Sequence, residues 1–161
     1  MSHLHIDDFS QDAARILMQC YLQFPKPQAV YVEDICGPTE VDDVGLHSPR
    51  HMACLSTMLW LADEGWLRYA ATIYQQGIEH AVLSSHGFNR LTAPSPVRVQ
   101  TPEPTLPAAL KLEKLSMAEQ LLQAIREQNS SVTTFLIRYL LAQPPQALPL
   151  DGAADIGLDV D

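Results

Sequence analysis

The sequence has little positive charge, and nowhere does that charge gather. Its 161 residues contain 10 Lys and Arg against 19 Asp and Glu, which gives a formal net charge of −9. The imbalance is greatest in residues 1–47, with two positive and eight negative charges, whereas residues 48–92 hold three of each. Phosphate contacts supply most non-specific nucleic-acid affinity, so a basic surface usually marks such binders. None of these segments has that signature.

Long apolar runs and a cysteine framework are also missing. No run approaches the roughly 18 residues that span a bilayer. Residues 1–8 carry histidines and acids where a secretory signal needs a basic and then an apolar stretch. We therefore expect a cytoplasmic protein without a membrane partner. The number of cysteines is odd, since the chain has only Cys20, Cys36 and Cys54, and two of them lie in apolar helical patterns. Both facts favour reduced thiols over a disulfide framework.

Catalytic signatures are weak or absent. There is no phosphate-binding glycine loop, and no nucleophile elbow surrounds the hydroxyl and imidazole of Ser84-Ser85-His86. A serine before a short apolar helix is more typical of a helix cap. The pair Asp42-Asp43 is typical of a solvated loop. We predict that the chain is not an enzyme and needs no cofactor.

One spacing is compatible with zinc. Cys36, His47 and His51 form a Cys, ten residues, His, three residues, His pattern of thiolate and imidazole ligands. A structural zinc site normally has a second cysteine two to four residues from the first, and none precedes Cys36. We therefore expect a core thiol and two loop or helix-cap histidines, and no metal.

Against these absences, two helices are strongly indicated. Apolar residues recur every three or four positions from Phe9 to Phe24, with Asp8 or Ser10 as the expected cap and Pro25 as the stop. Residues 29–36 suit a short extended piece followed by one helical turn, and residues 39–47 have the character of an acidic loop.

The second strong helix begins at Ser48-Pro49, a cap followed by proline at the first helical position, and ends at Gly65. At 100° per residue, its predicted inward face packs against Ile16 and its neighbours. That face consists of Met52, Leu55, Leu59 and Ala62, and the predicted outward face consists of Arg50, Ala53, Cys54, Thr57, Leu61 and Glu64.

The period then changes from helix to strand. Residues 66–74 and 78–84 are β-prone, and Gln75-Gln76-Gly77 between them predicts a hairpin turn. A short helix is expected to follow, from a serine cap to Leu91.

The rest of the chain separates into three predicted parts. Prolines are dense in residues 93–106, which predicts an extended, semi-rigid linker. Residues 107–142 predict a helical hairpin, with one helix over 110–125 and another over 132–140. Two amphipathic helices cannot bury both apolar stripes on each other, so they must dock on the preceding domain or on a second copy. Residues 143–161 predict an acidic, disordered tail.

Residues 9–91 resemble the winged helix-turn-helix superfamily of bacterial regulators. The resemblance rests on the helix 48–64, on Gly65-Trp66-Leu67 leading into the wing, and on Leu83-Ser84-Ser85-His86-Gly87-Phe88-Asn89-Arg90-Leu91 after it. It implies an α+β fold with a mostly helical winged-helix domain over residues 5–92 and a β-hairpin wing, followed by the C-terminal helical hairpin.

The resemblance also implies a dimeric, DNA-binding transcriptional regulator, in which the third helix enters the major groove and the wing touches the backbone or minor groove. Double-stranded DNA is then the expected partner, with the C-terminal helices forming the homodimer. The residues implicated in DNA binding are Ser48, Arg50, Thr57, Arg68, Gln75, Gln76 and Arg90.

The alternative is a winged-helix protein-interaction module. The outward face of the helix 48–64 has one guanidinium and is mostly apolar, whereas faces that read base edges present several hydrogen-bonding side chains. Apolar surface on a soluble protein usually marks an interface. The candidate interface residues are Trp60, Leu61, Leu121, Leu122, Ile125, Phe135, Leu136 and Tyr139.

Overall fold

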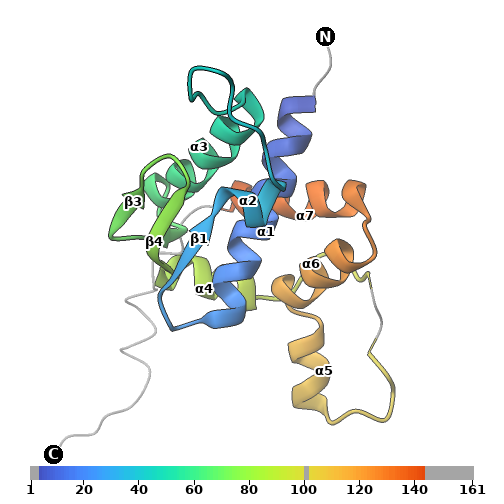
Figure 1. Cartoon of the computed structure of the whole chain (residues 1–161). Coiled ribbons are helices and arrows are strands. Elements are labelled where there is room, and N and C mark those ends of the chain that lie inside the picture. Colours follow the sequence, from blue (N-terminus) through green and yellow to red (C-terminus); the bar gives the residue numbers. More distant parts are fainter. Residues whose placement is uncertain (1–3, 100–101, 144–161) are drawn as a thin grey trace, which may run out of the picture.

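The computed structural model describes residues 4–99 and 102–143. Over these residues the chain is an α+β structure, as predicted, with seven helices around a small antiparallel sheet (Figure 1). The helices are α1 (Leu4–Gln23), α2 (Val32–Cys36), α3 (Pro49–Asp63), α4 (Ser85–Thr92), α5 (Ala108–Lys114), α6 (Met117–Arg126) and α7 (Ser130–Ala142). The strands are β1 (Gln28–Tyr31), β2 (Leu67–Arg68), β3 (Ala71–Ile73) and β4 (Gly77–Leu83).

Helix α1 runs through the centre of the fold and begins earlier than the sequence indicated. It contacts α3, α6, α7 and β4, and Ile16 on it is fully buried, as expected. Because it begins at Leu4, the prediction that Asp8 or Ser10 caps it is wrong. The Ser10 hydroxyl instead donates a hydrogen bond within the helix, to the Ile6 carbonyl at 3.0 Å. The Asp8 carboxylate, at the expected cap position, instead lies 3.7 Å from Arg50 of α3.

The predicted hairpin is confirmed, and β4 is the central strand of the sheet. β3 pairs with β4 around the turn, and β1 pairs antiparallel with β4 on the other side. Tyr74 adopts a positive φ of 48° in the turn. At Gly77 an added Cβ would lie 2.2 Å from the Val30 carbonyl oxygen, so only glycine lets the two strands approach so closely.

Helix α3 has the predicted ends. The Ser48 Oγ accepts a hydrogen bond from the His51 amide at 3.2 Å, and Pro49 occupies the first turn. The helix stops at Asp63, and Gly65 follows with a φ of +82° that favours glycine.

The predicted inward face of α3 is wrong in part. Leu55 is buried as expected, but Met52, Leu59 and Ala62 are only half-buried. The most buried positions include residues assigned to the outward face, namely Cys54, Thr57 and Leu61. Helix α3 contacts α1 and α2 as well as β2 and β4. A helix covered from more than one direction buries a wide arc, and its apolar periodicity then points to no single face.

The C-terminal helices also differ from expectation. The single helix over 110–125 is wrong, because the chain breaks at Leu115 into α5 and α6, and the Ser116 hydroxyl caps α6. The segment before them lies against this break. Pro94 and Ser116 form an isolated antiparallel β-bridge, and the Met117 amide donates a hydrogen bond to the Ala93 carbonyl at 2.8 Å.

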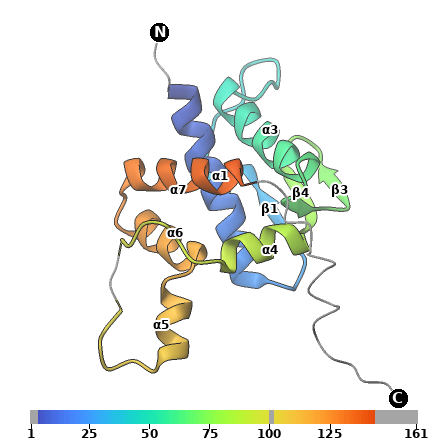
Figure 2. The same ribbon diagram turned by 180° about the vertical axis from the view of Figure 1, so that it is seen from behind.

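Helices α6 and α7 dock on α1 within the same chain, and in Figure 2 α7 crosses in front of it. Leu121 and Leu136 are fully buried in a core that also contains Ile16. The Gln11 side chain joins the two parts by donating to the Ser130 carbonyl at 3.1 Å. The C-terminal helices therefore complete the core around α1.

Two further observations complete the fold. Over residues 4–99 and 102–143, no helix is both long and apolar enough for a bilayer crossing. The three cysteines are free, with Cys20 and Cys54 buried and Cys36 half-buried. The predicted acidic tail, beyond Gln143, lies outside the described residues.

Candidate functional site: the groove between α1 and α3

An open groove of about 640 Å³ runs between the N-terminal half of α1 and the exposed side of α3. Its lining, called the α1–α3 groove below, is mostly apolar. The lining residues are His5, Asp8, Phe9 and Asp12 from α1, and Pro49, Arg50, Ala53, Ser56, Thr57 and Trp60 from α3.

Two aromatic rings close one part of the groove. Phe9 and Trp60 meet edge to face, with ring centroids 5.3 Å apart and planes at 85°. Trp60 is nevertheless 40% exposed, because Phe9 covers only part of the indole. A large aromatic side chain left open beside a mostly apolar groove marks a surface that a partner can bury.

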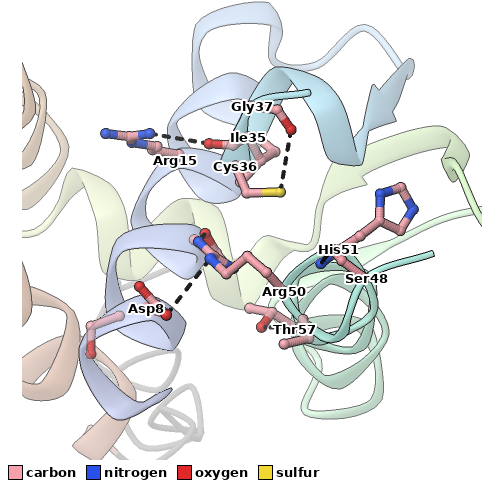
Figure 3. A network of polar contacts seen from close by, with 12 residues as sticks. Asp8, Arg15, Ile35, Cys36, Gly37, Ser48, Arg50, His51 and Thr57 are labelled. Atoms are coloured by element: carbon pink, nitrogen blue, oxygen red, sulfur yellow. Dashed lines mark hydrogen bonds and ion pairs between the residues drawn. The ribbon is translucent and has the colours of Figure 1, made fainter. Parts of the chain in front are cut away.

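An ion pair ties α3 to α1 in the groove (Figure 3). The Arg50 guanidinium donates to both carboxylate oxygens of Asp12, at 2.6 and 2.7 Å, and its Nε lies 3.7 Å from the Asp8 carboxylate. The Asp12 side chain is only 2% exposed, whereas that of Asp8 is 49% exposed. The hydrogen bonds to Asp12 raise the pKa of Arg50, against the opposing effect of burial. Arg50 therefore serves the internal pair, and Asp8 keeps half of its surface open.

The predicted DNA-binding residues divide into four that make internal contacts or are partly buried and three that are exposed. Ser48 caps α3, and Thr57 is buried with its hydroxyl bonded to the Ala53 carbonyl. Arg50 is paired with Asp12, and Arg90 lies half-buried in α4. The remaining three are exposed: Arg68 lies on β2, and Gln75 and Gln76 lie in the turn before β4.

Comparison with known proteins does not identify this site. The chain matches no protein-family model, no curated protein and no solved structure. The residues of the groove themselves therefore carry the functional argument.

The predicted protein-interface residues divide into two groups. Trp60, Phe135 and Tyr139 are exposed, by 40%, 52% and 40%. The others pack inside the chain, where Leu61, Leu121 and Leu136 are fully buried, Leu122 is 8% exposed and Ile125 is half-buried. Placing Leu61 on an outward interface was therefore wrong, because its side chain belongs to the core below α3.

The two histidines of the zinc-compatible spacing, His47 and His51, lie where the loop meets the hairpin turn. Because a carbonyl only accepts, the His51 Nε2 donates to the Gln75 carbonyl at 2.6 Å, and the His51 Nδ1 is hydrogen-bonded to the Thr39 hydroxyl at 3.1 Å. The His47 ring stacks on that of His51, with centroids 3.9 Å apart. The Cys36 thiol donates a hydrogen bond to the Gly37 carbonyl, with its sulfur 3.7 Å from the oxygen. Within the described part of the chain, Cys36, His47 and His51 do not form a metal-binding group.

Sequence reasoning missed the α1 half of the groove. Phe9 was assigned to the core stripe, and Asp8 to a cap. The available signal was Asp12, a carboxylate inside the apolar stripe of a strongly predicted helix. A buried carboxylate needs a cation, and Arg50 is the only basic residue of α3.

Proposed function

We propose that residues 5–92 form a winged helix-turn-helix domain that binds a helical segment of another protein in the α1–α3 groove. The element order supports the domain assignment: α1, β1, α2 and α3 precede a hairpin, and β1 pairs beside the last strand of that hairpin. In helix-turn-helix proteins the helix at this position is the one that usually meets DNA, and here the same helix forms one wall of the groove.

The single observation that carries the proposal is the chemistry of the groove. Its lining is mostly apolar, and the exposed residues of α3 include Ala53, Ser56, Trp60 and Asp63 but no cation. From Pro49 to Trp60 the groove follows about 16 Å of helix, or roughly three turns. An amphipathic helix that lays its apolar face between two others fits this length and this chemistry.

DNA binding is the second candidate, because the turn of the hairpin exposes Gln75 and Gln76, and β2 exposes Arg68. The charge balance is against it: residues 28–83 contain two arginines and eight carboxylates. Since Arg50 is paired with Asp12, only Arg68 of these two is left for phosphate.

The test uses helical peptides selected by display on the immobilised protein, together with two matched variants. Ala53→Arg fills the groove, and Ala109→Arg places the same side chain on an exposed alanine of α5. The selected peptides should bind the wild type and Ala109→Arg but lose at least about tenfold in affinity for Ala53→Arg. Equal affinity for the two variants, or no helical peptide selected, contradicts the proposal.

Two control measurements separate the other occupants. A labelled duplex at about 50 mM salt should show no salt-sensitive association, because phosphate contacts are strongest at low salt. Light scattering should give the same mass for the wild type and Ala53→Arg. Salt-sensitive binding weakened by Arg68→Ala would favour DNA, and a dimer that Ala53→Arg dissociates would assign the groove to a second copy.

A further inference from the structure

We infer that the helix bound in the α1–α3 groove is basic, with two cationic side chains flanking its apolar face about three to four turns apart. This inference rests on the proposed function and adds the chemical class of the partner. It follows from where negative charge is in excess within the groove and directly beyond its end.

The first site of that charge is Asp8. Both terminal nitrogens of Arg50 donate short hydrogen bonds to Asp12, and only its Nε lies near Asp8, at 3.7 Å. The lining thus contains two carboxylates and one guanidinium, with His5 as its other titratable group. With half of its surface exposed, Asp8 is available to a cation of the partner.

The second site lies at the other end of α3. Asp63 and Glu64 are exposed one turn beyond Trp60, at the helix C-terminus, and the last turn of α3 has no basic residue. The unpaired carbonyls of a helix C-terminus carry partial negative charge, which adds to that of the two carboxylates. Carboxylates that attract cations therefore lie in the groove at Asp8 and just beyond its other end at Asp63 and Glu64, while Trp60 between them offers apolar surface.

The geometry also sets the spacing of the two cations. From Arg50, beside Asp8, to Asp63 is 13 residues, or about 20 Å along the helix. Cations that lie on one face of a partner helix and span this distance are about 11 to 14 residues apart. A second copy of the chain that pairs groove to groove fits poorly, because residues 1–47, which supply the α1 wall, carry eight acids against two basic residues.

The test uses two capped helical peptides of about 18 residues that contain no tryptophan. They share one Leu and Phe face and carry either Lys or Glu at two flanking positions about 11 residues apart. Trp60 fluorescence reports the binding, because the indole is 40% exposed in the groove, whereas Trp66 is 3% exposed and gives a constant background.

At about 50 mM salt the Lys peptide should bind at least about tenfold more tightly than the Glu peptide, and at about 1 M salt the ratio should fall below about threefold. Asp8→Asn should weaken the Lys peptide about three- to fivefold without weakening the Glu peptide. Asp43→Asn, an exposed loop acid outside the groove lining, is the matched control and should change neither affinity.

The outcomes distinguish this inference from the proposed function. Equal affinities of the two peptides, or equal effects of Asp8→Asn and Asp43→Asn, overturn the inference and leave a groove that binds helices without regard to charge. Failure of both peptides and of every displayed helix overturns the proposed function and the inference with it.

Discussion

Replacing Arg50 by methionine should destabilise the protein by about 3 kcal/mol. The substitution removes both hydrogen bonds to Asp12 and leaves a carboxylate that is 2% exposed without a cation. Breaking a buried ion pair by removing one partner costs about 3–5 kcal/mol. The lower end applies here because the Arg50 side chain is 34% exposed, so water can reach the vacated position.

The reverse substitution should cost less. In Asp12→Leu the guanidinium stays partly solvated and has Asp8 at 3.7 Å, so the loss should be about 1–2 kcal/mol. The double variant Asp12→Leu/Arg50→Met buries two apolar side chains without an unpaired charge, and such replacements are often close to neutral. The two single losses together, about 4 to 5 kcal/mol, should therefore exceed the loss in the double variant by about 4 kcal/mol.

The free energy of unfolding of the four proteins is measured by urea titration, followed by helical circular dichroism. Arg126→Met, at an exposed arginine of α6, is the matched control and should stay within about 0.5 kcal/mol of the wild type. If the single losses add to within about 0.5 kcal/mol in the double variant, or Arg50→Met costs no more than an exposed pair, then this ion pair does not join α1 to α3 as argued.

Three further predictions concern the cysteines, the sheet and pH. Burial raises the pKa of Cys20 to about 12 and also raises that of Cys54. Iodoacetamide at about pH 8 should therefore alkylate the native protein at Cys36 alone, which mass spectrometry can check. Fast alkylation of all three cysteines would contradict the burial of Cys20 and Cys54. Gly77→Ala should cost at least about 2 kcal/mol in urea unfolding, because its Cβ meets the neighbouring strand, and an unchanged midpoint would refute that contact. Burial, and secondarily the charge of Arg90, lowers the pKa of His86 in the folded state. Because the unfolded chain takes up the proton first, the free energy of unfolding should fall as pH drops through about 6.5 and should level off below the pKa of the folded state. His86→Gln should remove this part of the pH dependence, and an identical profile in the variant would exclude the histidine as its source.

The amino-acid sequence by itself determined the features that depend on residues a few positions apart. The serine cap and proline at the start of α3 and the glycine after its end lie where the pattern predicted them, and the turn that pairs β3 with β4 lies one residue earlier than predicted, with Gly77 already in β4. Capping and turn formation are local, because donor and acceptor, or the residue with positive φ, belong to the same short segment. The order of the main helices and strands followed from these signals.

Only the tertiary structure decided which side of α3 is exposed and what fills the space beside it. Periodicity assigns one inward face, but α3 is covered by α1, α2 and the sheet together, so Leu61 entered the core and Trp60 stayed open. Arg50 looked like a free cation until the fold brought it to Asp12, 38 residues away in sequence. The apolar pattern of a helix indicates that residues are buried but not which neighbouring elements cover them. An ion pair between residues distant in sequence forms only when their helices pack together.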